Sequence, residues 1–377
     1  MLSIQKQNGF FNPTKTKTPY LIIDKSLITE KYIKLKQITD DVKIFYAVKA
    51  NPDMEIICHL NELGSGFEIA SEQELDDVID AGVNPDKIIS SNPHKTLDFI
   101  KAAYQVGVRY FAYDSSMEVD KLSQLAPGCK GYLRIIVDNS KSEWPLSKKF
   151  GVNPSEAISL LEYAQASKIK PYGITFHVGS QCMDSISWIK AISQVAEIFK
   201  IAENKGIILK MLNIGGGVPI QYTKNTPLIS KIRDEISQSI NKHFSNRDIE
   251  IMAEPGRALI GDCGNISTKI IMRAKRGNET WLYLDIGVFN GLMETIEGIK
   301  YRILSEKQIS GNMKSEEIIP YTIAGPTCDS VDTMYKDYLL PRDLGLGDVL
   351  YFMNAGAYTM SYASNFNGFP IPKIYFI

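Results

Sequence analysis

The sequence lacks any long uninterrupted hydrophobic segment, although 44% of its 377 residues are hydrophobic. A helix needs about 18 or more consecutive apolar residues to cross a membrane. The first 20 residues also lack the basic segment and apolar run that make up a secretory signal. We therefore expect no membrane span and a cytoplasmic location.

A surplus of charge of either sign is also absent. Lys and Arg together number 42 and Asp and Glu 43, which leaves a net charge of -1. Proteins that bind nucleic acids or anionic membranes through global electrostatics carry a basic surplus. We therefore expect neither partner, and a small molecule is the expected ligand.

Cysteine is scarce, and its spacing excludes two kinds of site. The five cysteines are odd in number, lie far apart and form no C-x-x-C pair. Such a pattern predicts neither a disulfide framework nor a zinc site, so no metal is expected. Four of them suit small apolar positions in a core, whereas Cys328 lies in a polar loop.

From residue 43 onward, short β-rich apolar runs alternate with amphipathic helical stretches. The eight runs are IFYAVKA, GFEIAS, KIISS, YFAYD, GYLRIIV, GITFHVGS, MLNIGGG and IEIMAEPG. Eight βα repeats in roughly 200 to 250 residues favour a (β/α)8 TIM barrel over an open doubly wound sheet. An earlier run, YLIID near residue 20, makes a ninth strand that could instead pair with whatever follows the barrel.

After residue 260 the sequence changes to β-rich segments without regular helices. This pattern predicts an antiparallel β domain, and the chain is longer than one hydrophobic core usually serves. We therefore predict two domains. The barrel takes residues 25–260, and the β domain takes residues 1–24 and 261–377.

Chemistry in such a barrel takes place where the strands end, and several reactive residue types stand at these positions. Lys49, Glu68, His177 and Glu254 each end a predicted strand, and Arg134 lies within another. A lysine that loses hydration in a barrel mouth has a lowered pKa and becomes nucleophilic. A lysine at the protein surface is an equally good interpretation of this position alone.

The other positions also have two interpretations each. Three glycines at 215–217 let a backbone approach an anion closely, but they also suit a flexible turn. Glu254 could simply favour a helix start, and His177 could be a core histidine. Glu74 fits either a site residue or a capping box with Ser71.

Seven motifs, in order from about residue 20 to residue 370, resemble those of one enzyme family. They are FYAVKAN, GFEIASEQE, FHVGSQ, NIGGGVP, AEPGRAL, GPTCDSVD and GAYTMSYASNFNGF. The chain resembles the ornithine/lysine/arginine decarboxylases of the alanine-racemase-like fold, and most closely the ornithine decarboxylases. The resemblance implies a barrel that binds pyridoxal 5'-phosphate, a β domain, and a homodimer whose active sites are shared across the interface.

The resemblance also assigns roles to barrel residues. Lys49 binds the cofactor covalently and Glu68 supports it, while Glu254 contacts the pyridine nitrogen. His177 stacks on the ring without acid–base work, and Arg134 neutralises charge near the cofactor. The cofactor phosphate is assigned to Ser180, Gly215, Gly216, Gly217, Gly256, Arg257 and Tyr358.

In the β domain the resemblance makes Cys328 the proton donor in the neighbouring subunit's site. Asp329 binds the distal ammonium of the substrate, and Phe366 lines its pocket. Eukaryotic ornithine decarboxylases carry an aspartate where this chain has Thr295, beside Glu294, so Glu294 is a further substrate-binding candidate. Lys149 and Asp332 resemble an ion pair that bridges subunits, although Lys149 could equally be a solvated loop charge.

The predicted reaction is decarboxylation of L-ornithine to putrescine, and also of L-lysine to cadaverine, in polyamine biosynthesis. Arginine, diaminopimelate or carboxynorspermidine decarboxylation is an alternative, because the substrate-binding positions depart from the family pattern. A non-catalytic regulatory homologue is a third reading. Such proteins lose cofactor residues, whereas this sequence keeps them.

Overall fold

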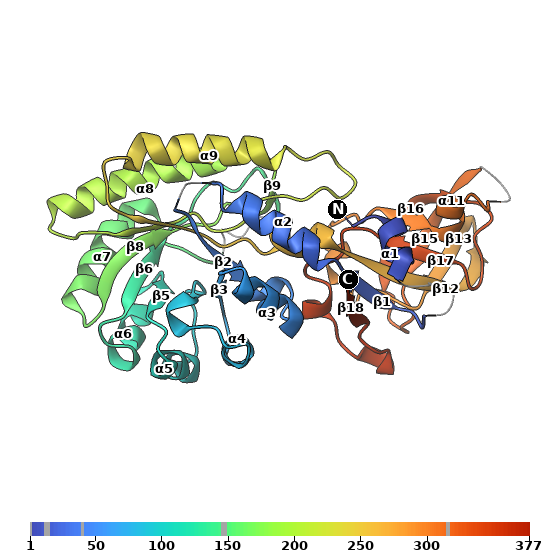
Figure 1. Ribbon diagram of the computed structural model, residues 1–377, viewed down its shortest axis with the longest axis horizontal. Coiled ribbons are helices and arrows are strands. Elements are labelled where there is room, and N and C mark those ends of the chain that lie inside the picture. Colours follow the sequence, from blue (N-terminus) through green and yellow to red (C-terminus); the bar gives the residue numbers. More distant parts are fainter. Residues whose placement is uncertain (1, 11–15, 39–40, 145–148, 314–316) are drawn as a thin grey trace. The chain divides into compact units, whose positions relative to one another are not determined.

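The computed structural model describes residues 2–10, 16–38, 41–144, 149–313 and 317–377. The chain divides into two compact units (Figure 1). The barrel unit takes residues 29–219 and 226–258. The β unit takes residues up to 28, residues 220–225 and residues 259–377.

Within the described residues, eight parallel strands form a closed barrel in the order β10-β11-β2-β3-β4-β5-β6-β8. They are β2 (Lys43–Ala47), β3 (Gly66–Glu68), β4 (Ile88–Ser90), β5 (Tyr110–Tyr113), β6 (Lys130–Arg134), β8 (Lys170–Thr175), β10 (Met211–Asn213) and β11 (Glu250–Ala253). Each overlaps one of the eight predicted runs, and β2, β6 and β8 begin before theirs, so the predicted barrel is confirmed. A small two-stranded sheet of β7 (Ser142–Trp144) and β9 (Ser180–Cys182) stands beside it in the same unit.

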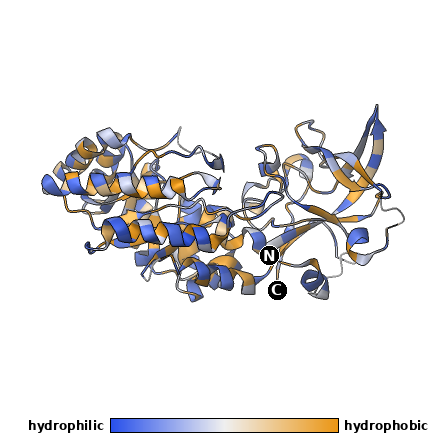
Figure 2. Ribbon diagram, turned by 90° about the horizontal axis from the view of Figure 1, so that it is seen from above, coloured by the Kyte–Doolittle hydropathy of each residue, from blue (hydrophilic) through white to orange (hydrophobic). Residues whose placement is uncertain are grey.

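Amphipathic helices connect the barrel strands, and Figure 2 shows hydrophilic and hydrophobic residues interleaved along them. Four begin at residues whose side chains accept a backbone N–H, namely Asp53, Ser71, Thr96 and Ser115, which stabilises a helix start. The helices are α2 (Lys25–Leu35), α3 (Met54–Glu62), α4 (Glu72–Asp80), α5 (Leu97–Val106), α6 (Ser116–Leu125), α7 (Ala157–Ala166), α8 (Ile186–Asn204) and α9 (Ile229–Phe244). None of the helices that the structure describes is long and apolar enough to cross a membrane.

Side chains from six strands fill the interior of the barrel. The buried members of this cluster are Phe45, Ile89, Ala112, Tyr132, Met211 and Met252. Burial of a large apolar side chain stabilises a fold by about 1.5–3 kcal/mol. Because the interior is packed in this way, ligands are expected at the mouth, where the strands end.

The β unit contains one eight-stranded sheet, with β14-β17-β12-β13-β15-β16 in sequence and β1 joining β12 to β18. Its strands are β1 (Tyr20–Ile23), β12 (Gly264–Arg276), β13 (Glu279–Leu284), β14 (Ile303–Ser305), β15 (Ile318–Ala324), β16 (Thr333–Pro341), β17 (Val349–Phe352) and β18 (Lys373–Phe376). The YLIID run therefore pairs with strands that follow the barrel. The helices α1 (Ile4–Phe10) and α11 (Glu306–Ser310) belong to this unit, and α10 (Arg257–Ile260) lies at its boundary.

The sheet of the β unit is mixed and not wholly antiparallel. The pairs β13–β15 and β1–β18 are parallel, and the other pairs are antiparallel. Parallel neighbours require a long crossover, and β14 and α11 lie within the crossover between β13 and β15. The fold class is confirmed with this refinement.

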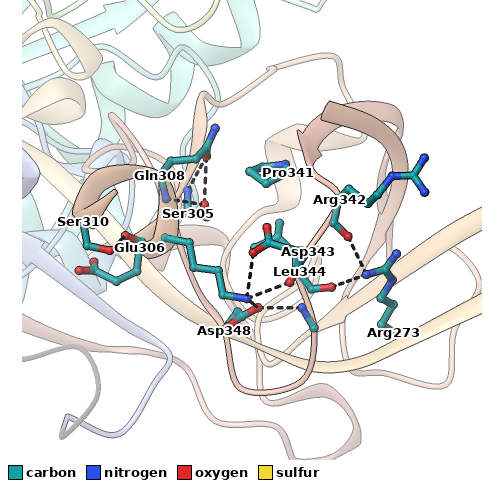
Figure 3. A network of polar contacts seen from close by, with 12 residues as sticks. Arg273, Ser305, Glu306, Gln308, Ser310, Pro341, Arg342, Asp343, Leu344 and Asp348 are labelled. Atoms are coloured by element: carbon teal, nitrogen blue, oxygen red, sulfur yellow. Dashed lines mark hydrogen bonds and ion pairs between the residues drawn. The ribbon is translucent and has the colours of Figure 1, made fainter. Parts of the chain in front are cut away.

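A polar network stabilises the turn between β16 and β17 (Figure 3). Lys307 of α11 donates to the carbonyl oxygen of Asp343 at 2.8 Å and to the carboxylate of Asp348 at 2.7 Å. Arg273 of β12 donates to the carbonyl oxygen of Leu344 at 2.7 Å. Backbone carbonyls that would otherwise lack partners in this turn are thereby satisfied.

Candidate active site

Lys49 lies directly after β2, in the one-turn 3-10 helix η1 (Val48–Ala50). Its Nζ forms an ion pair with the carboxylate of Glu68, the last residue of the neighbouring strand β3. The Glu68 side chain is 2% exposed, whereas that of Lys49 is 50% exposed. The structure therefore brings these two predicted residues together and leaves the lysine side chain accessible at the barrel mouth.

Glu254 follows β11 and presents its carboxylate to the same mouth. Its Oε1 accepts hydrogen bonds from Ser91 Oγ and Asn213 Nδ2. Burial, together with the negative charge of Glu68, raises the pKa of Glu254 to about 7. A carboxylate with such a pKa can hold or release a proton near neutral pH.

Glu74 is the third carboxylate of this region, and it serves a structural purpose as well. Ser71 Oγ accepts the Glu74 N–H at 3.2 Å, while the Glu74 carboxylate accepts the N–H of Ala70 at 2.7 Å. Burial and the charge of Glu68 raise the pKa of Glu74 to about 7. Both sequence interpretations of Glu74 thus describe part of what the structure shows.

His177 lies just beyond β8 and is neutral at physiological pH. Its Nδ1 accepts the N–H of Gly179 at 2.9 Å, so the ring hydrogen resides on Nε2. Burial and the positive charges of Arg134 and Lys49 lower the pKa of His177 to about 3. A neutral ring suits packing against a ligand, as predicted, and does not suit proton transfer at neutral pH.

Arg134 ends β6, and its guanidinium carbon lies 4.7 Å from the centre of the Phe150 ring. This is a cation–π contact. Burial lowers the pKa of Arg134, and the carboxylate of Glu254 opposes this effect. Arg134 therefore adds positive charge to the group that contains Lys49 and Glu254.

The glycines after β10 are required by close backbone contacts. Gly215 and Gly217 have φ values of 65° and 100°. A Cβ on Gly215 would lie 2.3 Å from the carbonyl oxygen of Phe176, and one on Gly217 would lie 2.4 Å from that of Gly179. No other residue type fits these two positions without moving the backbone.

Around these glycines the chain offers hydrogen-bond donors. The amides of Gly216 and Gly217 have no acceptor within the part of the chain that the structure describes. Arg257 is 5% exposed, and its guanidinium donates to Ser180 Oγ at 3.4 Å. Donors of this kind, next to the turn at Gly256, suit the phosphate of pyridoxal phosphate. The barrel residues therefore fit this cofactor.

In the β unit, a buried carboxylate stabilises the loop that carries Cys328 and Asp329. Asp332 is 2% exposed, and its carboxylate accepts the N–H groups of Val288 at 2.7 Å and Thr327 at 2.9 Å. Cys328 and Asp329 themselves are exposed. Their roles, and the intersubunit ion pair of Asp332, stay predictions.

The remaining predicted residues also belong to the β unit. Phe366 is 41% exposed, and its ring centre lies 4.6 Å from that of Phe289. Tyr358 is half-buried and has a positive φ of 56°. Glu294, in η5 (Met293–Thr295), is only 2% exposed. Its contact with substrate stays a prediction.

Known proteins are similar to this chain in both sequence and fold. Residues 25–261 match the family described as pyridoxal-dependent decarboxylase, pyridoxal binding domain. A lysine/ornithine decarboxylase of Selenomonas ruminantium is 34% identical over 364 residues, which cover 95% of this chain and 90% of the relative. Antizyme inhibitor 2 of Xenopus laevis is 32% identical over 375 residues, which cover 96% of this chain and 82% of the relative.

Two solved structures have the same architecture. SrLDC in complex with PLP and cadaverine has a TM-score of 0.90 and 31% identity, over 100% of this chain and 94% of that chain. The arginine decarboxylase of Paramecium bursaria Chlorella virus has a TM-score of 0.90 and 30% identity, over 99% of each chain. This chain belongs to the pyridoxal-dependent decarboxylases.

Membership of this family confirms the resemblance inferred from the motifs. The decarboxylase is a lyase whose cofactor is pyridoxal phosphate. The barrel residues assigned to that cofactor converge on one mouth, as described above. Their individual roles remain predictions.

Sequence reasoning missed three polar residues of this decarboxylase. Ser91 follows β4, Asn213 ends β10, and Tyr132 lies in β6 with its hydroxyl 2.6 Å from Ser91 Oγ. Two of them stand at strand ends, so the rule that found Lys49 and Glu68 also applies to them. They were missed because serine and asparagine at such positions are typical of turns.

The buried histidine gives the decarboxylase a predicted pH dependence of stability. The pKa of His177 is about 3 in the folded chain and about 6.5 in the unfolded chain. Between these pH values the unfolded chain is protonated at His177 and the folded chain is not, so folding stability falls as the pH falls. We expect His177→Gln to reduce this loss by a few kcal/mol, on an order-of-magnitude basis. Urea unfolding of the cofactor-free protein at several pH values measures it. Glu74 and Glu254 have the opposite effect on the pH dependence of stability, but they are present in the wild type and in His177→Gln, so the difference between the two proteins isolates His177. An equal pH dependence in the two proteins would show that His177 is protonated in the folded state.

Proposed function

We propose that this chain decarboxylates a basic L-amino acid, with L-ornithine as the first substrate and L-lysine as the second. The observation that carries the proposal is the Lys49–Glu68 pair in the same barrel mouth as Glu254. The similar proteins include lysine/ornithine and arginine decarboxylases, which supports a basic substrate. We further propose that the enzyme works in the cytoplasm as a homodimer.

Pyridoxal phosphate, when bound, supplies a ring that accepts the electron pair left behind when carbon dioxide departs. Lys49 holds the cofactor through its amine, and Glu68 orients that amine. Glu254 keeps the ring nitrogen protonated, which strengthens the electron-accepting character of the ring. His177, being neutral, packs on the ring face without competing for that proton.

Recognition of the substrate side chain is assigned to Asp329. Its carboxylate is exposed, and a charge-assisted hydrogen bond to a distal ammonium is favourable. Glu294 is buried in its own unit and ranks behind Asp329 in this role. One methylene changes binding by only about 1–3 kcal/mol in any pocket, so activity on both ornithine and lysine is expected.

Initial rates on five substrates test the assignment. L-Ornithine is expected to be fastest, and L-lysine to follow within about 10–200-fold. A faster rate on L-arginine, diaminopimelate or carboxynorspermidine would replace ornithine as the substrate. A purified protein that binds no pyridoxal phosphate, seen as missing cofactor absorbance, would instead favour the non-catalytic reading.

Cys328 is proposed to return a proton to the α-carbon after carbon dioxide has left. Without it, the α-carbon would be protonated less often, and pyridoxal phosphate, when bound, could take up the proton and the amino nitrogen instead, so that part of the product would leave as an aldehyde. We therefore expect Cys328→Ala to lower amine formation about 10²–10⁴-fold and to yield some aldehyde. Chromatography of the products measures both, and Cys58→Ala, which alters a half-buried thiol on α3, is the matched control.

The proposed sharing of active sites between subunits has its own test. If Cys328 serves the partner's Lys49, then Lys49→Ala and Cys328→Ala subunits complement each other when mixed. Random exchange gives hybrids with one intact site, so about a quarter of the wild-type activity should return. An absence of recovery, with hybrids confirmed by mass, would place Cys328 in its own subunit's site or outside the site.

A further inference from the structure

Two polar residues, each at the end of a different strand, donate hydrogen bonds to one oxygen of Glu254. Ser91, directly after β4, reaches across the barrel mouth and donates to Oε1 of Glu254, which follows β11. Asn213, at the end of β10, donates to the same oxygen through Nδ2. Its Oδ1 accepts the N–H of Gly215 at 2.9 Å, which fixes the amide so that its NH2 group faces Glu254.

Tyr132 fixes the direction of the Ser91 hydroxyl. The Tyr132 side chain is fully buried, and its hydroxyl lies 2.6 Å from Ser91 Oγ. Ser91 is its sole hydrogen-bond partner among the described residues, so the tyrosine satisfies its buried donor by donating to Ser91. Ser91 then has its own single hydrogen left for Glu254.

The second oxygen of Glu254 is different. No described residue donates a hydrogen bond to Oε2, whereas Oε1 accepts two. Two donors on one oxygen stabilise the ionised carboxylate and fix its rotation. The carboxylate therefore presents Oε2 to the barrel mouth as an acceptor.

We propose that Ser91 and Tyr132 are positioning residues that hold Glu254 ionised and turn its Oε2 toward the ring nitrogen of the cofactor. This inference rests on the proposed function, because it takes Glu254 as the partner of that nitrogen. Burial raises the pKa of Glu254 to about 7, and the hydrogen bonds of Ser91 and Asn213 counteract this rise. The hydroxyl groups of Ser91 and Tyr132 thus favour the ionised form of the Glu254 carboxylate at neutral pH.

Ser90 provides a matched control on the same strand. It is fully buried one residue before Ser91, and its hydroxyl has no hydrogen-bond partner in the described part of the chain. Ser90→Ala therefore removes the same atom from the adjacent position without touching Glu254. Ser91→Thr keeps the hydroxyl and serves as the conservative variant.

The first readout is the protonation of Glu254 in the cofactor-free protein. Infrared spectra with 13C-labelled glutamate, with Glu254→Gln to identify the band, follow this carboxyl through a pH titration. We expect Ser91→Ala to raise the Glu254 pKa by about one pH unit, because a hydrogen bond to a charged group is lost. Ser90→Ala and Ser91→Thr should retain the wild-type titration.

The double variant Ser91→Ala/Tyr132→Phe separates electrostatics from packing. Ser91→Ala leaves the Tyr132 hydroxyl buried without an acceptor and should lower the melting temperature. Removing that hydroxyl as well should restore much of the melting temperature while the Glu254 pKa stays raised. An unchanged Glu254 pKa in the double variant would overturn the proposal. This test can be made even if Ser91→Ala alone fails to fold.

The second readout uses the holoenzyme. The acidic limb of kcat against pH, and the pH dependence of the cofactor absorbance, should move up by about one pH unit in Ser91→Ala. If the carboxyl titration of the cofactor-free protein shifts and the holoenzyme does not respond, the positioning of Glu254 stands and its assignment to the ring nitrogen fails. If neither moves, Ser91 has only a packing role.

Discussion

Replacing Lys49 with alanine is expected to abolish decarboxylation and the absorbance of covalently bound cofactor. The alanine has no amine to bond the cofactor, and it leaves the buried carboxylate of Glu68 without its ion-pair partner. Lys49→Arg separates these effects, because a guanidinium keeps the charge beside Glu68 but is not nucleophilic at neutral pH. We expect both variants to be inactive and the arginine variant to retain more of the wild-type stability. Release of carbon dioxide, the visible spectrum and thermal unfolding measure these effects.

Lys43→Ala is the matched control, because Lys43 begins the strand at whose other end Lys49 stands. Lys43 Nζ lies 2.9 Å from Glu250, and its side chain is 55% exposed. Such a surface ion pair contributes about 0–1 kcal/mol, so near-normal turnover is expected. Turnover and cofactor absorbance that survive in Lys49→Arg would remove Lys49 from the proposed role.

All eight barrel strands could be predicted, because buried parallel strands are short, nearly continuous apolar runs between turn signals. The β unit was harder. β14 has only three residues, and β16 contains Lys336 and the positive-φ residue Asp337, which interrupt any alternation. The parallel pairs were also missed, because strand neighbours are set by long-range packing that a local pattern does not contain.

In the site, too, a local sequence pattern locates some residues but not the contacts that depend on long-range packing. Lys49, Glu68 and Glu254 could be located from the rule that barrel chemistry lies at strand ends. The hydrogen bond from Ser91 to Glu254 could not be found in this way, because only closure of the barrel brings the end of β4 opposite the end of β11. Burial of Glu294 was equally invisible to a local pattern.

Replacing Glu254 with glutamine is expected to lower kcat by on the order of 10²–10³-fold while the fold is retained. The amide has the same shape and its oxygen still accepts from Ser91, but it carries no negative charge to hold a proton on the ring nitrogen. Activity of the wild type should rise as the pH rises through about 7, where Glu254 ionises. The variant should lose this acidic limb, which a pH profile of kcat measures directly.

The control for this change lies at the start of the same strand. Glu250 accepts the hydroxyl of Tyr172 at 2.6 Å and pairs with Lys43, so Glu250→Gln alters a carboxylate of β11 outside the mouth. Among the described residues of the barrel mouth, Glu74 competes for the pH effect, because its pKa is also raised to about 7. If Glu254→Gln keeps the acidic limb and Glu74→Gln loses it, then Glu74 is the titrating group and Glu254 has no part in holding the ring proton. Loss of the limb in Glu254→Gln alone, together with the fall in kcat, assigns the titration to the carboxylate of residue 254, since the shape and the hydrogen bonds that Oε1 accepts are preserved.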